Sequence, residues 1–135
     1  MSISTPLRSS AALAFLCATA AAFALQSPAA PAPDAEEAAG ALVGELVFSA
    51  DLLTSLDKLC PRSRPQADWH AALPRLPAQA TTPDLLDLSR RLGEDAGRRL
   101  VRESGGCLSV SFREAYKDSR ENFDELIERW QQIAP

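Results

Sequence analysis

The amino-acid sequence predicts an all-α fold, a small helical bundle of three long helices plus one short helix, stapled by one disulfide. Apolar residues recur at spacings of three and four along three long segments, which is typical of amphipathic helices. No segment shows the sustained alternation of apolar and polar residues that a half-buried strand requires. A pair of cysteines, Cys60 and Cys107, stands where two of these helices end.

Residues 1–24 have the layout of a secretory signal peptide. A positive charge at Arg8 precedes an apolar run from 11 to 24, which closes on the small-residue pattern Ala22-Phe23-Ala24. The run is shorter than the about 20 residues that cross a bilayer as a helix, and no later segment is expected to reach that length. Cys17 raises the alternative of lipoprotein acylation, but Leu16 stands before it where a small residue is expected. The sequence therefore predicts an exported protein, periplasmic or secreted, without a transmembrane segment after cleavage.

Residues 25–33 are rich in proline and alanine and are expected to form a flexible tether before a single helical domain at 34–135. The first helix is predicted over 35–59. Asp34 is its expected N-cap, and acidic residues follow in the first turn, where carboxylates favour the positive end of the helix dipole. Its apolar stripe consists of Leu42, Leu46, Leu53, Leu56 and Cys60.

The segment 61–82 contains several prolines, so it leaves room only for one short helix, predicted around 67–73. The next long helix begins at Thr82 as N-cap and Pro83 as first helical residue, and it ends at Gly105-Gly106. Its expected buried face consists of Leu85, Leu92, Ala96 and Leu100.

The last long helix is expected to open with a capping box formed by Ser111 and Glu114. A stripe of large apolar residues follows at helical spacing. It consists of Phe112, Tyr116, Phe123, Leu126 or Ile127, Trp130 and Ile133. Such a stripe is more often a buried core face than a platform for a ligand.

Cys60 and Cys107 are the two cysteines that remain after the leader is removed, and an even pair in an exported chain predicts a disulfide. The loop that the bond closes corresponds to about 4 kcal/mol of stabilisation in the chain-entropy model. Because both cysteines follow the C-terminal ends of helices, the bond requires the first and third predicted helices to run in the same direction.

Small residues form two tracks that predict close helix packing. Gly40 and Gly44 are four residues apart in the first helix, as are Ser89, Gly93 and Gly97 in the third. A glycine inside a helix costs roughly 0.5–1 kcal/mol relative to alanine, so the tracks suggest a compensating approach of two backbones. The alternative is that these glycines are merely tolerated.

Charged residues alternate along the third predicted helix, with acids at Asp87, Glu94 and Asp95 four residues before arginines. Acid before base at this spacing supports a solvated helix face. A second interpretation is that arginines of this helix bind an anionic partner. These arginines are Arg90, Arg91, Arg98 and Arg102.

Composition argues against several classes of function. The chain has 14 Lys and Arg against 18 Asp and Glu, which is the opposite of the balance in most nucleic-acid-binding proteins. His70 is the only histidine, so a multi-histidine metal site is excluded. A Cys60–His70 nucleophile pair is one alternative for catalysis, but the disulfide would consume its thiol. A pair of carboxylates for glycoside cleavage is another, but nothing in the sequence marks such a pair as buried. We therefore expect no catalytic residues, no metal and no cofactor.

The sequence thus favours a non-enzymatic exported protein that binds another exported protein, such as an inhibitor or an immunity-type protein. The expected contact region is the connection between 61 and 82, since Trp and Arg are enriched at interface hot spots. Its candidate contact residues are Arg62, Arg64, Trp69, His70 and Arg75. Alternatively, Trp69 simply fills the core of the bundle. The alternative function is a structural or envelope-homeostasis factor that self-associates, for example as a homodimer, through a helix face.

Overall fold

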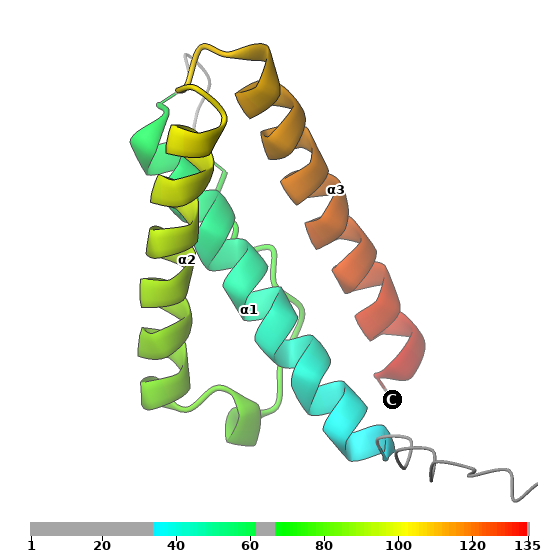
Figure 1. Ribbon diagram of the computed structural model, residues 1–135. Helices are drawn as coiled ribbons and strands as arrows, with labels where there is room; N and C mark the ends of the chain where they lie inside the picture. Colours follow the sequence, from blue (N-terminus) through cyan, green and yellow to red (C-terminus); the bar gives the residue numbers. More distant parts are fainter. Residues whose placement is uncertain (1–33, 62–66, 135) are drawn as a thin grey trace, which may run out of the picture. The chain divides into compact units, whose positions relative to one another are not determined.

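The computed structural model describes residues 34–61 and 67–134, so the predicted leader and tether lie outside the described residues. The described chain is all-helical and contains no strand (Figure 1). Its elements are helix α1 (Ala35–Leu59), the 3-10 helix η1 (Ala78–Ala80), helix α2 (Pro83–Glu103) and helix α3 (Val110–Ile133). The predicted fold class is confirmed, and the first helix has the predicted bounds.

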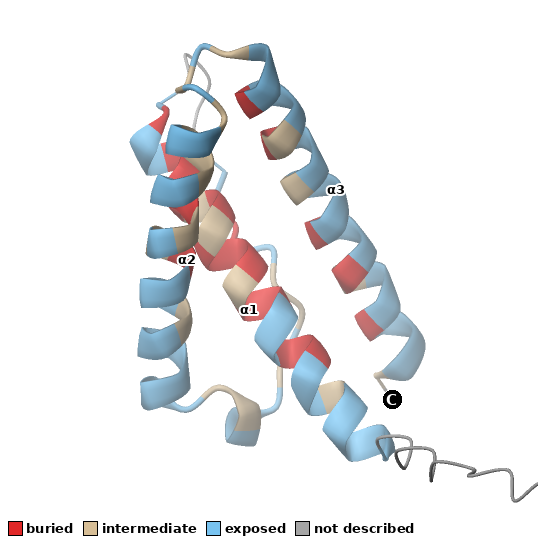
Figure 2. Ribbon diagram, in the orientation of Figure 1, coloured by how far each residue is buried: buried red, intermediate tan, exposed pale blue. Residues whose placement is uncertain are grey.

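Helix α1 is the centre of the bundle. It begins at Asp34, whose side chain accepts a hydrogen bond of 2.7 Å from the backbone amide of Glu37. Both α2 and α3 pack against α1, whereas they barely contact each other. Figure 2 shows the result: buried residues follow α1 and the inner face of α3, while α2 is largely exposed. Each outer helix therefore depends on α1 for its place in the fold.

The core lies mainly between α1 and α3. Five large side chains of α3 are buried against the apolar residues of α1, namely Phe112, Tyr116, Phe123, Leu126 and Trp130. The interpretation of this stripe as core is confirmed for these residues. Ile133, the last residue of the predicted stripe, is instead 52% exposed because the helix ends there.

Helix α1 is also long and apolar enough to cross a membrane, judged by length and composition alone. The prediction that no segment after the leader reaches that length overlooked this helix. More than half of its most apolar window is buried inside the domain. This burial is typical of the core helix of a bundle, so the length of α1 does not by itself indicate a membrane span.

The disulfide between Cys60 and Cys107 is present, with the two Cα atoms 5.4 Å apart. Gly105 and Gly106 end α2 with φ angles of 85° and 100°, a left-handed conformation that favours glycine. The amide of Gly106 donates to the carbonyl of Val101, which closes the helix end. The chain thereby turns toward Cys60, and α1 and α2 run in the same direction, as the predicted bond required (Figure 1).

The predicted short helix at 67–73 is wrong, because the chain forms turns there. The Asp68 side chain accepts a hydrogen bond from the Ala71 amide, and Pro74 prevents the turn from continuing as a helix. The start of α3 also differs from its prediction. Ser109, not Ser111, is the N-cap, and its Oγ accepts a hydrogen bond from the Phe112 amide.

The glycine tracks have different surroundings. A Cβ atom added at Gly93 would lie 2.7 Å from the Cβ of Asp51, and one at Gly97 would lie 2.5 Å from Oγ of Ser55. The backbone of α2 therefore approaches α1 closely at these two residues. The expected matching role of Gly40 and Gly44 is not found among the described residues, none of which would lie within 4 Å of a Cβ added at either glycine.

Candidate protein-binding surface

Four leucines of α2 are about half exposed to solvent. Leu85 is 49% exposed, Leu86 42%, Leu88 47% and Leu92 51%. We call these four residues the leucine surface. They border a groove of about 530 Å³ between α2 and the N-terminal half of α1, whose lining is mostly apolar. The α1 side of this groove consists of Gly40, Gly44, Glu45, Val47 and Phe48.

The exposure of Leu85 and Leu92 corrects the prediction that they belong to the buried face of this helix. The reason is that α1 contacts α2 along the edge formed by Gly93 and Gly97, which are the buried residues of α2. Leu85, Leu88 and Leu92 lie on the neighbouring edge of the helix, whereas Leu86, seven residues before Gly93, lies on the same edge nearer the start of α2. Toward their N-terminal ends α1 and α2 diverge, so α1 does not cover them (Figure 1).

The sequence contained a signal for this surface that periodicity alone did not reveal. Leucine occupies positions 85, 86 and 88. Three leucines so close together spread over more of the helix circumference than one neighbouring helix can bury.

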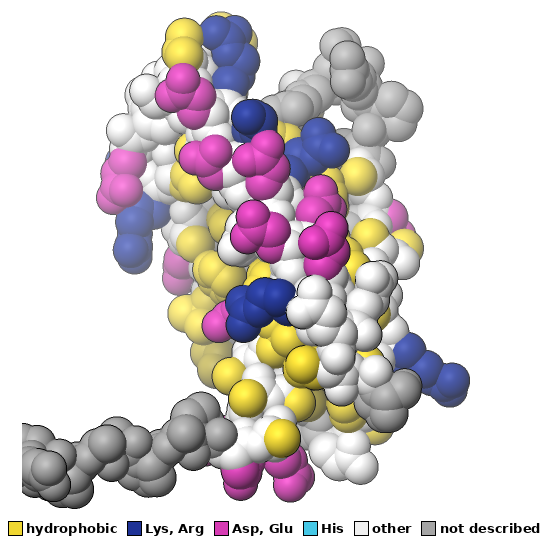
Figure 3. Space-filling view, turned by 90° about the vertical axis from the view of Figure 1, so that its right-hand side faces the viewer, with side chains coloured by type: hydrophobic (Ala, Val, Ile, Leu, Met, Phe, Trp, Pro, Cys, Tyr) yellow, Lys and Arg dark blue, Asp and Glu magenta, His cyan; other side chains and the backbone are white. Residues whose placement is uncertain are grey.

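The domain also carries charged side chains next to its apolar regions. Figure 3, which faces α3, shows acidic and basic side chains interspersed with hydrophobic ones, which gather at mid-height toward the left.

The predicted contact residues of the connection are not brought together as one exposed site. Trp69 is buried, and its ring meets Phe123 edge-on with centroids 5.7 Å apart. The guanidinium of Arg120 lies over the same ring. The structure thus places Trp69 in the core, the alternative that the sequence also allowed. His70 and Arg75 are exposed, and Arg62 and Arg64 lie outside the described residues.

A buried carboxylate explains why Trp69 turns inward. Asp57 is 6% exposed, and its two oxygens accept hydrogen bonds of 2.7 Å from Trp69 Nε1 and from the Tyr116 hydroxyl. Asp57 belongs to α1 and Tyr116 to α3, while Trp69 belongs to the connection. A buried carboxylate needs hydrogen-bond donors to offset its desolvation. Asp57 therefore joins three parts of the chain at one point.

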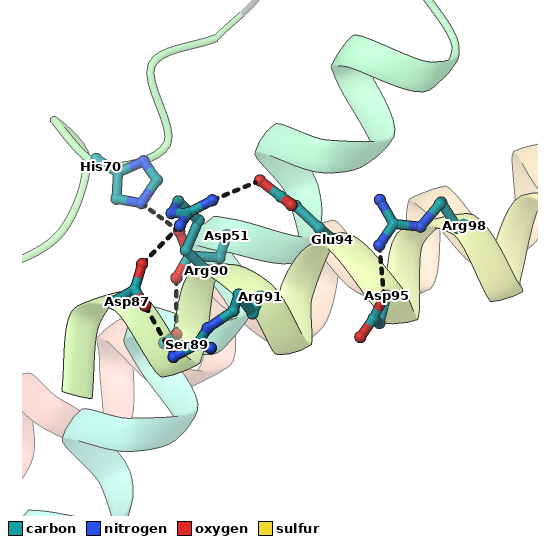
Figure 4. A network of polar contacts seen from close by, with 9 residues as sticks. All are labelled: Asp51, His70, Asp87, Ser89, Arg90, Arg91, Glu94, Asp95 and Arg98. Atoms are coloured by element: carbon teal, nitrogen blue, oxygen red, sulfur yellow. Dashed lines mark hydrogen bonds and ion pairs between the residues drawn. The ribbon is translucent and has the colours of Figure 1, made fainter. Parts of the chain in front are cut away.

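Asp51 forms a second such junction, which Figure 4 shows together with its partners His70 and Ser89. Its carboxylate accepts a 2.7 Å hydrogen bond from Ser89 Oγ of α2 and lies 2.8 Å from Nε2 of His70. The three residue types are those of a catalytic triad, but their order is different. In a triad the histidine stands between serine and carboxylate and takes the serine proton. Here the Asp51 carboxylate stands between Ser89 and His70, and Nδ1 of His70 lies 3.5 Å from Oγ1 of Thr54, which also belongs to α1. These contacts tie the connection and α2 to α1.

Sequence reasoning missed both carboxylates, although a signal was present. Asp51 and Asp57 lie within the most apolar helix of the chain, six residues apart and interleaved with the leucine stripe. An acid within a buried stripe indicates a partner that compensates its charge. Ser89, which the sequence assigned to a small-residue track, supplies one of these partners.

The exposed face of α2 carries the expected ion pairs, with some different partners. Arg90 pairs with Asp87 and Glu94, Arg91 with Asp87, and Arg98 with Asp95 (Figure 4). The hydrogen bond from Arg90, together with the charge of Arg91, lowers the pKa of the Asp87 carboxyl. The hydrogen bonds that Arg90 donates to Asp87 and Glu94 raise the pKa of its guanidinium. Because these groups are exposed, the pairs contribute little to stability.

We expect Asp57→Ala to lower the free energy of unfolding by about 2–3 kcal/mol, because Trp69 Nε1 and the Tyr116 hydroxyl would lose a charged acceptor. Urea unfolding followed by tryptophan fluorescence measures this loss. Asp95→Ala is the matched control, since Asp95 makes an exposed pair and its removal should change stability by less than about 0.5 kcal/mol. Equal effects of the two substitutions would contradict the assigned role of Asp57.

Within the described residues, no group of three or more His, Cys, Asp or Glu side chains is arranged to hold a metal ion. Comparison of the chain with protein-family models, with curated proteins and with solved structures found no match.

Proposed function

We propose that this chain is an exported, non-enzymatic protein that binds another exported protein, and that the leucine surface is its contact. The observation that carries the proposal is the exposure of four neighbouring leucines at 42–51% beside an apolar groove. Contiguous exposed apolar residues with a polar surround are typical of protein-binding sites. The signal-peptide pattern at 1–24 supports the exported location, in the periplasm or outside the cell.

This proposal moves the contact from the connection to α2. The connection was favoured for its tryptophan, but Trp69 is held in the core by Asp57 and Phe123. A residue that is 9% exposed offers little surface to a partner. The leucine surface presents its side chains without any rearrangement of the core. An inhibitor or an immunity-type protein would use such a preformed surface to occlude its target.

Self-association as a structural or envelope-homeostasis factor is the second candidate function. The specific observation in its favour is that leucine side chains and a groove with glycines at its side, at Gly40 and Gly44, occur on the same face of one chain. One copy could therefore supply both halves of an interface.

The proposal is tested by chemical cross-linking of the tagged chain in the periplasm of its own host, followed by mass spectrometry. We expect wild type to cross-link to one reproducible exported protein. Leu85→Ser/Leu92→Ser should lose that product while keeping its helical circular dichroism spectrum. Leu108→Ser is the matched control, because Leu108 is 94% exposed but lies outside the leucine surface.

Two results would contradict the proposal. One is a partner that cross-links to wild type and to the Leu85→Ser/Leu92→Ser variant equally well. The other is turnover of peptide or peptidoglycan substrates by the purified chain, which would make it an enzyme.

A further inference from the structure

We infer that the free protein is a homodimer in which the α2 helices of two copies pair antiparallel through the leucine surface. The inference rests on the proposed function only in taking the leucine surface as a protein-binding surface, and it names a second copy as the occupant. A partner that binds the same surface would then have to displace this copy.

The spacing of the leucines is self-complementary. Leu85, Leu88 and Leu92 follow the three-four spacing of a helix-packing seam. In an antiparallel pair, Leu85 of one copy lies opposite Leu92 of the other when the two-fold axis passes beside Leu88. Each leucine then meets an apolar residue of the second copy. The seam is short, since Asp95 and Arg99 follow it on the same face, and this limits the pairing to one register.

The charges beside the seam select the antiparallel orientation. Asp84 stands at the N-terminal end of the leucines and Arg91 toward their C-terminal end. Both residues lie on the same flank of the seam, and a parallel pair would put this flank on opposite sides of the interface in the two copies. The antiparallel pair puts the two flanks on the same side, places Asp84 of one copy within a turn of Arg91 of the other, and also opposes the two helix dipoles. Charge complementarity between these two residues is therefore obtained in the antiparallel orientation, with Arg91 also paired to Asp87 of its own copy.

The groove supplies room for the second helix. Among the described residues, a Cβ added at Gly40 or Gly44 would meet nothing within 4 Å, so these positions are open toward the described chain on the α1 side of the groove. Phe48, which is half-buried, also lines it. Glycine inside a helix is otherwise unfavourable, and no described residue of the same copy fills the space at these two positions. The second copy's α2 would pack into this space as a helix in an apolar groove.

The first test is the molar mass of the purified protein by sedimentation equilibrium at about 100 µM, where a dimer of micromolar Kd is mostly associated. We expect wild type to have the mass of a dimer. Leu88→Glu should weaken the dimer by roughly 30-fold or more, as expected for a charge placed in an interface centre. Leu108→Glu, on an exposed residue away from the seam, should remain dimeric.

The second test determines the relative orientation of the two α2 helices by disulfide trapping. Each variant adds one new cysteine, while Cys60 and Cys107 stay paired as in wild type. Leu88→Cys lies beside the two-fold axis and should form a covalent dimer on mild oxidation. Arg99→Cys lies on the same face, but in the antiparallel pair its two copies would be about 30 Å apart along the axis, so it should not.

The inference is overturned by a monomeric wild type, by dissociation with Leu108→Glu as complete as with Leu88→Glu, or by equal trapping at 88 and 99. A monomer that still cross-links to another exported protein through Leu85 and Leu92 would overturn this inference alone. A monomer with no such partner would overturn the proposed function as well.

Discussion

Replacing both Cys60 and Cys107 by alanine is expected to lower the melting temperature by more than about 15 °C. The bond joins residues 47 positions apart in the sequence, so the chain-entropy model assigns it about 4 kcal/mol. That is a large part of the stability of a domain with one modest core. The bond is also placed where its loss has a large effect on stability. The buried residues of α2 are Gly93 and Gly97, while its Leu100 and Val101 are only partly buried against the core.

Circular dichroism melts with and without reductant provide the measurement and its control. Wild type should approach the melting temperature of the double variant when reductant is added, and the double variant should not respond. Mass spectrometry after thiol alkylation should find no alkylated Cys60 or Cys107 in native wild type. A melting temperature unchanged by the double substitution would show that packing on α1 alone holds the bundle together.

The helix ends could be predicted because their causes are local. Asp34 caps α1 through a neighbouring amide, and Gly105-Gly106 ends α2 through its own left-handed backbone. Such contacts involve residues within one turn of each other, so the sequence contains them directly. The disulfide was predictable for a different reason, because the export that the leader pattern predicts leaves few alternatives for an even pair of cysteines.

The errors arose where distant contacts decide the local structure. The turns at 67–73 depend on Asp57, which draws Trp69 inward from another part of the chain. Ser109 and Ser111 are both suitable N-caps, and the turn that leaves Gly106 selects Ser109. In each case the local sequence permits two structures, and a partner that periodicity does not identify chooses between them.

The leucine surface could not be predicted from the sequence for a geometric reason. A helical pattern shows which residues share a face, but it does not show which edge a neighbouring helix touches. Here the glycines at 93 and 97 allow α1 to approach one edge, which leaves Leu85 and Leu92 uncovered on the next. Periodicity therefore identified the apolar side of α2 correctly and misjudged how much of it the fold buries.

The approach of α2 to α1 leads to the second large effect. Gly93→Leu is expected to destabilise the domain by about 3 kcal/mol or more, and α2 should detach from α1 in part of the population. A Cβ at this position would lie 2.9 Å from the backbone nitrogen of Leu52 and 2.7 Å from the Cβ of Asp51. Backbone cannot yield as a flexible side chain does, so the two helices would have to separate, breaking the bond from Ser89 to Asp51.

Thermal melts of Gly93→Ala and Gly40→Ala make the sharpest comparison, because the same methyl group is added to the interior of a helix in each. At Gly93 it meets the α1 backbone and should destabilise, by about 1–3 kcal/mol. At Gly40 it meets no described atom of the same chain within 4 Å, so in solution dilute enough to keep the inferred dimer dissociated it should stabilise by about 0.5–1 kcal/mol through helix propensity. Arg98→Ala, on the solvated face, should change stability by less than about 0.5 kcal/mol. Gains of equal size at Gly93 and Gly40 would show that α2 can shift on α1 without cost, and the close approach of the two backbones would then not hold α2 in place.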